Sequence, residues 1–522
     1  MGERVNVVVG AGFGGLSAAV ELARRGERVV LLERSAHVGG KARAISVAGR
    51  PIDIGPTVLT MRWVFDEMFA SCGLRLEDAV GLIPLPVVAR HELAGGATLD
   101  LFSDVERSAD AIGAVAGAKE AAAYHRFAAY SAEIARTVEQ PFLRSARPSM
   151  TSLVLGTSRL GLGSLARIDA HRSMWRALCS FFEDPRLRTL FARYATYVGS
   201  SPFEAPATLN LIAHVEREGV AAVAGGVSSL AQATADLARS LGVEIVTCCA
   251  VRDVLVTNGR VTGVVAEHED GTREVIGAKT VVVNADVATI ANGALGERAA
   301  AAVPAVHRGR RSLSAITWAI TGKVSGFDLA HHTVFFSNDY AAEHRALFDV
   351  RRLPDDPTIY VCAQDRLAAR EERRHPAEGH EKEGERLFLI ANAPATADTN
   401  PLSTEDIDRC ERTIMARLSR AGLHIEPSAM VVSTPMTFER LAPGTGGAIY
   451  GEACHGALAP LTRPTSRTKL RGLYLTGGSV HPGPGVPMAA LSGRAAAQAV
   501  LEDLASTTRS PRVAIAGSTS MP

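Results

Sequence analysis

A cluster of glycines near the N-terminus has the spacing of a phosphate-binding turn. Gly10, Gly12, Gly14 and Gly15 lie in the sequence GAGFGG, directly after an apolar run. Such a turn lets the backbone approach a pyrophosphate, and a helix that begins there directs free N–H groups and the positive end of its dipole at the phosphates. Glu33 follows about 20 residues later, where an acid is expected to bind a ribose hydroxyl. The pattern therefore predicts a dinucleotide site.

The elements needed to position this turn follow in the expected order. Residues 5–9 predict a buried strand, the apolar spacing from Leu16 predicts a helix that ends at Gly26, and residues 28–32 predict a second strand. Strand, glycine turn, helix, strand and acid together form the unit that binds dinucleotides in doubly wound sheets. The unit alone does not separate FAD from NAD, and a glycine-tightened turn that binds nothing is the alternative.

A second glycine turn lies near the far end of the chain. Residues 470–478 (LRGLYLTGG) predict a strand that ends in glycines, residues 479–487 predict a stiff turn, and residues 488–504 predict an alanine-rich helix. The N-terminus of this helix could return to the first sheet and complete the cofactor pocket. A pocket that needs distant parts of the chain is expected of FAD.

The middle of the chain changes character twice. Helical patterns dominate residues 89–219, alternating helix and strand patterns with two hairpin signals occupy residues 225–284, and residues 311–361 are rich in strand patterns. We therefore predict an α/β fold with two domains and a tail. The FAD-binding domain is predicted to comprise residues 1–88, 222–291 and 441–505. The inserted substrate domain, mainly helical plus sheet, is predicted to comprise residues 89–221 and 292–440. Residues 506–522 are predicted to form a disordered tail.

Composition narrows the class of partner and the compartment. The 522 residues carry a formal net charge of +1, so no charge argument supports a nucleic-acid partner. Seven cysteines, an odd number without CxxC spacing, indicate free thiols in a reducing compartment and no metal site. A core strand begins almost at once and no apolar run reaches roughly 18 residues, so we expect a cytoplasmic protein without a signal peptide or a membrane span.

These motifs together resemble a known family. With its glycine turn, the pair Gly39-Gly40, the DxGPT turn at residues 53–57 and the LYLTGG…HPGPGVP segment at residues 473–487, the chain resembles the FAD-dependent carotenoid desaturases of the phytoene-desaturase type, within the amine-oxidase-like flavoproteins. The resemblance covers nearly the whole chain. Residues 55–62 and 477–493 are most similar to the 1-hydroxycarotenoid 3,4-desaturases, also called methoxyneurosporene or hydroxyneurosporene dehydrogenases.

The resemblance implies a Rossmann-type FAD-binding domain of the amine-oxidase kind and a set of cofactor contacts. Gly10, Gly12, Gly14 and Gly15 would surround the pyrophosphate, Glu33 would bind the adenosine ribose, and Gly40, Lys41 and Arg43 would line the diphosphate side. Gly55, Pro56, Thr57 and Val58 would lie beside the isoalloxazine, and Val251 would meet the adenine through its backbone. Asn284 belongs to a further family block, and Gly478, Val486, Pro487 and Met488 would lie at the ribityl and flavin end. For any one glycine or proline taken singly, turn geometry is the alternative.

Desaturation would remove two hydrogens from neighbouring carbons of a polyene, neither of which is acidic. The physically reasonable route is hydride transfer to flavin N5, delocalisation of the cation along the polyene and then proton loss, while the protein positions the substrate. Asp184, Arg188, Glu216 and His481 are candidates for proton handling. Each also has a structural interpretation, since Asp184 precedes a proline and could cap a helix, Glu216 could be ion-paired and His481 could bind backbone. No catalytic residue is assigned from the sequence.

A carotenoid substrate also predicts a membrane partner. Burial is worth about 0.8 kcal/mol per CH₂, so carotenoids stay in the bilayer, and the enzyme must dock on its surface and offer an apolar tunnel. Residues 152–168 are a candidate interfacial contact or an ordinary core helix. Five aromatic residues could line the tunnel or pack in the core: Phe181, Phe182, Phe191, Tyr194 and Tyr197. The expected electron acceptor is a quinone or oxygen.

Other functions stay open at this point. One is a phytoene desaturase or another flavin amine-oxidase-like or retinol-saturase-like oxidoreductase, and the other is a flavin-binding scaffold without catalysis. The scaffold is disfavoured because both ends of the cofactor pocket carry their motifs.

Overall fold

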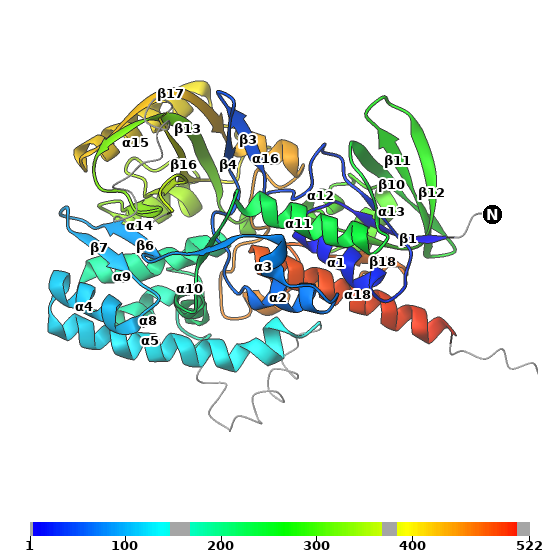
Figure 1. Ribbon diagram of the computed structural model, residues 1–522, viewed down its shortest axis with the longest axis horizontal. Coiled ribbons are helices and arrows are strands. Elements are labelled where there is room, and N and C mark those ends of the chain that lie inside the picture. The colour runs from blue at the N-terminus through cyan, green and yellow to red at the C-terminus, as the bar shows by residue number, and fades with distance from the viewer. Residues whose placement is uncertain (1–3, 147–167, 368–383, 509–522) are drawn as a thin grey trace, which may run out of the picture.

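The computed structural model describes residues 4–146, 168–367 and 384–508 of the chain. Two large β-sheets organise these residues, and Figure 1 shows them on the right and on the upper left of the molecule, with helices packed against both. Among the helices in these ranges, none is long and apolar enough to cross a membrane.

The first sheet is built around the strand that precedes the glycine turn. Its order is β10 (Cys249–Thr257), β11 (Arg260–His268), β12 (Arg273–Val283), β1 (Val5–Val9), β2 (Val29–Leu32) and β9 (Glu244–Val246), and β18 (Leu473–Leu475) also pairs with β12. β1 runs parallel to both β2 and β12, as a doubly wound sheet requires. All these strands lie inside the segments predicted for the FAD-binding domain, although the exact domain limits stay a prediction.

One face of this sheet is covered by α1 (Phe13–Ala23), α11 (Val227–Ser240) and α18 (Val486–Thr508). α1 begins directly after the glycine turn, as predicted. Helices α1 and α18 approach very closely, since a Cβ on Gly493 would lie 2.2 Å from the Gly14 carbonyl oxygen. The Ser17 hydroxyl also donates to the Ala490 carbonyl at 2.7 Å. The two ends of the chain are therefore joined at the glycine turn (Figure 1).

The second sheet is mostly antiparallel and lies over the helical part of the chain. Its order is β17 (Leu423–Ser433), β13 (Ser314–Gly326), β16 (Glu385–Ala393), β15 (Ile359–Ala363), β14 (His332–Phe335), β6 (Ala89–Glu92) and β7 (Thr98–Leu101). One face packs against α15 (Thr404–Arg420) in an apolar core that includes Trp318 and Leu389. Below β6 and β7 lie α4 (Val105–Ala116), α5 (Ala118–Val138), α8 (Met174–Phe181), α9 (Pro185–Ala192) and α10 (Leu211–Arg217) (Figure 1).

A hairpin from the N-terminal part of the chain joins the two halves. Its strands β3 (Ala44–Val47) and β4 (Arg50–Asp53) pack on the second sheet, where Val47 and Ile52 meet Phe388. The Gln364 side chain accepts from the Asp53 N–H at 3.1 Å and donates to the Asp53 carbonyl at 2.7 Å. Residues that the sequence assigns to the FAD-binding domain therefore help to hold the substrate sheet.

Within the segment where helical patterns dominate, α9 ends at Ala192 and continues as a 3-10 turn over Arg193–Val198, and α8 begins at Met174 because Ser173 caps it through the Arg176 N–H. α18 continues to Thr508, past the predicted start of the tail at residue 506. The predicted interfacial segment 152–168 lies outside the described residues except for Ile168.

Candidate cofactor and active site

A large cavity runs between the two sheets. Its volume is about 1140 Å³, above the roughly 300–1,000 Å³ of ordinary small-molecule pockets, and it is large enough for more than one ligand. Except for Gly15, every cofactor residue predicted from the sequence lines it: Gly10, Gly12, Gly14, Glu33, Gly40, Lys41, Arg43, Gly55, Pro56, Thr57, Val58, Val251, Asn284, Gly478, Val486, Pro487 and Met488. The structure thus brings together residues spread over almost 480 positions of the sequence.

Gly15 permits close packing next to the glycine turn. A Cβ on Gly15 would lie 2.0 Å from the Gly10 carbonyl oxygen, so a side chain there would separate α1 from β1. Gly15 was expected beside the pyrophosphate, but it does not line the cavity. In the structure it allows α1 to pack closely on β1. Asn284, at the end of β12, closes the other side of the turn by donating from its side-chain amide to the Gly10 carbonyl at 3.3 Å.

Glu33 lies where the sequence motif places a ribose-binding acid. Its carboxylate is buried at the end of β2 and accepts hydrogen bonds from the Ala11 N–H at 2.7 Å and the Ser35 N–H at 2.8 Å. These bonds fix the carboxylate beside the glycine turn, with remaining acceptor capacity for a ribose hydroxyl.

Four cations line the cavity and form no ion pair in the described part of the chain. Arg34 donates to the Leu441 carbonyl, Lys41 donates to the Ile449 carbonyl, and Arg463 donates to three backbone carbonyls, while the Arg43 side chain makes no hydrogen bond there. Desolvation lowers the pKa of Lys41, Arg43 and Arg463, which shows that their charges are held at a cost. Because none of the four forms an ion pair with a carboxylate of the described residues, the group fits an anionic diphosphate at the glycine turn.

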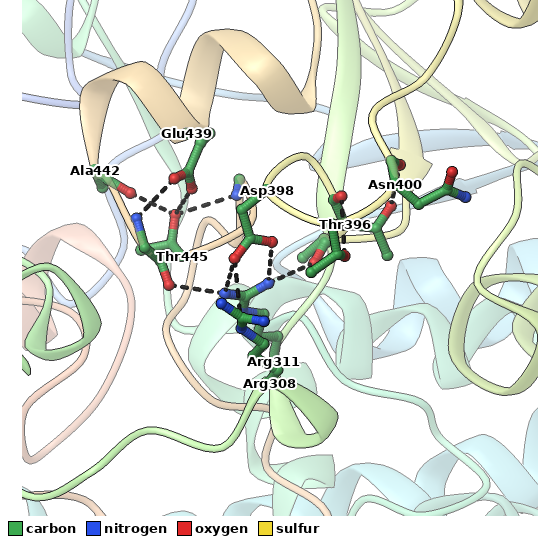
Figure 2. Close-up of polar contacts among 12 residues, drawn as sticks. Arg308, Arg311, Thr396, Asp398, Asn400, Glu439, Ala442 and Thr445 are labelled. Carbon is green, nitrogen blue, oxygen red and sulfur yellow. Dashed lines mark hydrogen bonds and ion pairs between the residues drawn. The ribbon is translucent and has the colours of Figure 1, made fainter. Parts of the chain in front are cut away.

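The loop that supplies three of those carbonyls is held by a polar network (Figure 2). Arg311 binds both carboxylate oxygens of Asp398 at 2.6 and 2.7 Å, and it also donates to the Gly444 carbonyl at 2.8 Å. Glu439, in α16 (Pro435–Leu441), accepts from the Gly444 N–H at 2.7 Å and from the Thr445 hydroxyl at 3.3 Å. The network therefore positions residues 441–450 across the cations of the cofactor site.

The second sheet forms the opposite wall of the cavity. Side chains on one face of four adjacent strands line it: Thr317 on β13, Phe388, Ile390 and Asn392 on β16, Tyr360 on β15, and His332 and Val334 on β14. Within each strand they are two residues apart, as expected when one face of a sheet meets a ligand space. The Tyr360 hydroxyl is 2.6 Å from the Thr57 hydroxyl and also hydrogen-bonds His332 Nδ1. Thr57 thus joins the cofactor loop to this wall.

The four proton-handling candidates occupy different surroundings. Asp184 caps α9 through the Arg186 N–H, and Arg188 donates to the Phe182 and Glu183 carbonyls. The Nε2 atom of His481 lies 3.0 Å from the Phe142 carbonyl oxygen. These three residues do not line the cavity, so the structural interpretation of each is the one that the geometry supports.

Glu216 does line the cavity but is fully engaged. It forms an ion pair with Arg193 at 3.2 Å and accepts hydrogen bonds from Tyr194 and from Tyr197, the latter at 2.9 Å. Tyr197 lines the cavity, whereas the four other aromatic residues proposed for a tunnel pack in the apolar core around Phe127: Phe181, Phe182, Phe191 and Tyr194.

Several cavity residues had no role in the sequence prediction: Arg463, Tyr360, His332 and Arg193. His331, His332 and Cys362 also lie within 4.8 Å of one another, a grouping that the sequence did not predict. Burial raises the pKa of the Cys362 thiol, which disfavours the thiolate that a metal ion would require, so we assign no metal to the grouping.

Comparisons with known proteins agree with this geometry. A family model for flavin-containing amine oxidoreductases matches residues 13–501. Hydroxyneurosporene desaturases of Rubrivivax gelatinosus and Cereibacter sphaeroides are 46% and 42% identical over 98% and 96% of this chain, and over 96% and 98% of their own lengths. These relatives confirm the resemblance to carotenoid desaturases that the motifs indicate.

Solved structures show the same fold at low identity. Cyclohexylamine oxidase from Brevibacterium oxydans IH-35A superposes with a TM-score of 0.58 at 14% identity, covering 97% of this chain and 100% of that one. An oxidoreductase from Methanosarcina mazei gives 0.56 at 17% identity, covering 95% and 99%. The predicted α/β, amine-oxidase-like fold class is thereby confirmed. The chain belongs to the flavin-containing amine oxidoreductase family and is an FAD-dependent oxidoreductase.

Proposed function

We propose that this protein desaturates a hydroxylated carotenoid, such as hydroxyneurosporene, at its C-3,4 bond. The observation that carries the proposal is the shape of the cavity, which continues from the cofactor residues into a chamber walled by the second sheet and by apolar side chains such as Val138, Ile212 and Val334. A long hydrocarbon is not stabilised by unpaired charges in the wall of its site. The charged residues that line the chamber, Arg193 and Glu216, form an ion pair with each other. The relatives' substrate supports the choice of a hydroxylated carotenoid.

The residues of the chain would perform distinct tasks in this reaction. FAD supplies the oxidant that accepts a hydride. The glycine turn, Glu33 and the four cations without ion pairs would hold its adenosine and diphosphate, while Thr57 and Val58 would lie beside its isoalloxazine. The apolar chamber aligns the polyene and excludes water, so that the hydride donor carbon stays close to the acceptor.

Turnover with defined carotenoids tests the proposal. Purified holoenzyme would be incubated with liposomes that contain 1-hydroxyneurosporene, neurosporene or phytoene, and the product spectra would be recorded. A red shift with the hydroxylated carotenoid alone is the expected result. Conversion of phytoene instead would indicate a phytoene desaturase, and bleaching of the flavin by a small amine would indicate an amine oxidase. Repeating the assay without oxygen, with and without a soluble quinone, would identify the electron acceptor.

A membrane surface is the proposed source of the substrate. Leu458 is 58% exposed and Tyr197 is 39% exposed, and both line the cavity, so they place apolar surface at its opening. Large apolar side chains exposed at a ligand entrance mark an interaction site. We expect Leu458→Asp to weaken flotation with liposomes, whereas Val350→Asp, at a residue that is 63% exposed but away from the cavity, should float like the unchanged protein. Equal flotation of both variants would contradict the assignment of this surface.

A further inference from the structure

The reaction needs an acceptor for a proton as well as for a hydride, and the cavity wall contains one pair of residues arranged to take it. Tyr360 is partly accessible from the cavity, and His332 is buried beside it with the two rings stacked at 5.7 Å between centroids. The Tyr360 hydroxyl hydrogen-bonds His332 Nδ1 and lies 2.6 Å from the Thr57 hydroxyl. A group that faces the substrate is thus connected to a base behind it.

The sheet register places this pair. β14 and β15 are antiparallel, with Val334 opposite Tyr360 and His332 opposite Cys362, so Tyr360 and His332 are diagonal neighbours on the same face. That face is the one that lines the cavity. Thr57 reaches the pair from the loop that follows β4, which is expected to lie beside the isoalloxazine.

The protonation states suit a relay. Burial lowers the pKa of His332 well below 6.5 and raises the pKa of Tyr360 well above 10, so both groups are neutral at pH 7. A neutral imidazole that accepts the phenol hydrogen at Nδ1 carries its own hydrogen at Nε2, and Nε2 has no hydrogen-bond partner. The Thr57 hydroxyl can donate to the phenol oxygen and stabilise it as its proton leaves.

We propose that Tyr360 and His332 together accept the proton that the substrate loses during desaturation. The inference rests on the proposed function. After the hydride has left one carbon, the C–H bond of the neighbouring carbon breaks, its electron pair forms the new C=C bond, and its proton goes to the Tyr360 oxygen. The phenol proton moves at the same time to His332 Nδ1. A polyene cation is a strong acid, so a weak base in an apolar wall is sufficient to take the proton.

The acids and histidines that the sequence suggested for proton handling do not offer this capacity. The Glu216 carboxylate already accepts from Arg193, Tyr194 and Tyr197. Asp184 and His481 do not line the cavity. His331, next to His332 in the sequence, does not line the cavity either, and its Nδ1–H donates to the Ala363 carbonyl at 2.9 Å. His331 is therefore a matched control.

Anaerobic flavin bleaching tests the relay. Holoenzyme would be mixed with liposomes containing 1-hydroxyneurosporene, with or without deuterium at the carbon that loses the proton, and the loss of flavin absorbance would be followed. The polyene cation can take its hydride back until the proton has left, so net bleaching requires the proton loss. In Tyr360→Phe the rate at saturating substrate should fall by about 100-fold or more, the usual contribution of a general base, and the isotope effect should rise because proton loss becomes limiting. His332→Asn should behave in the same way, and His331→Asn should match the unchanged enzyme. Bound flavin should be equal in all four proteins.

Three results would overturn the inference. The first is a Tyr360→Phe variant that bleaches at the unchanged rate and isotope effect, and the second is one that loses its flavin. The third is a variant that only needs more substrate, which would make Tyr360 the binding group for the substrate hydroxyl. If either Tyr360→Phe or His332→Asn does not fold, the same three results are read from the variant that does fold. An unchanged enzyme that shows no bleaching would instead refute the proposed function itself.

Discussion

Removal of the Asp398 carboxylate should loosen the loop that covers the cofactor cations. Arg311 and Asp398 have side chains that are 7% and 15% exposed, and they share two short charge-assisted hydrogen bonds. Loss of one partner from a buried ion pair costs about 3–5 kcal/mol. In Asp398→Ala, Arg311 keeps its hydrogen bonds to the Ala395 and Gly444 carbonyls, and solvent screens the edge of the pair. We therefore expect Asp398→Ala to lose about 2 kcal/mol of stabilisation of this loop.

This loosening should appear as weaker FAD retention, since residues 441–450 carry the carbonyls that bind Arg34 and Lys41. A loss of about 2 kcal/mol corresponds to roughly 30-fold in the dissociation constant if it is fully transmitted. The constant would be measured from the flavin fluorescence released on dilution of the holoenzyme. Asp355→Ala is the control, because Asp355 is 83% exposed and its ion pair with Arg352 should contribute little.

The pH dependence gives a second measure of the same pair. The Arg311 guanidinium lowers the pKa of Asp398 below its ordinary 3.8, so the stabilisation should be constant above about pH 4 and disappear only as the pH falls through the lower folded-state pKa. If Asp398→Ala retains FAD as tightly as Asp355→Ala between pH 6 and 8, the network does not position the loop, and the reasoning fails.

Three further changes test other parts of the structure. Glu33→Gln should weaken FAD binding about tenfold by removing a buried charge-assisted acceptor, as measured by the same fluorescence assay, and unchanged binding would refute its ribose role. Gly15→Ala should prevent accumulation of folded protein, because its Cβ would lie 2.0 Å from the Gly10 oxygen, whereas Gly309→Ala, with 3.7 Å to its nearest neighbour, should be tolerated. Burial raises the pKa of Asp53 from 3.8 to about 6, so the folded state binds a proton more tightly than the unfolded chain and stability should be lost as the pH rises through 6. Asp53→Asn should therefore gain up to about 3 kcal/mol over the unchanged protein at pH 8 and little at pH 4, and parallel pH profiles in denaturant unfolding would contradict this.

The parts of the fold that could be predicted are those with a local signal. Strand 5–9, the glycine turn and α1 follow from apolar periodicity and glycine spacing within 20 residues. The Arg311–Asp398 pair joins residues 87 positions apart, and nothing in the neighbourhood of either one predicts the other. The pairing of Tyr360 with His332 depends on the register of β14 and β15, since a slip of one residue would turn one of the two side chains to the opposite face. Such contacts exist only after the sheets have assembled.

The two ends of the cavity differ in charge, and this difference separates the effects of mutation. The cofactor end contains Arg34, Lys41, Arg43 and Arg463, which form no ion pair in the described part of the chain, so changes there alter the electrostatic attraction for a diphosphate. On the opposite wall, Tyr360 and His332 are neutral, and they contribute no net charge to cofactor binding. Substitutions of the cations should therefore lower the amount of bound flavin, and substitutions of the pair should leave the flavin bound but slow its reduction. Thr57 touches both regions through its hydroxyl, so Thr57→Val is the one change expected to affect the rate of flavin reduction through the hydrogen bond to Tyr360 rather than through charge.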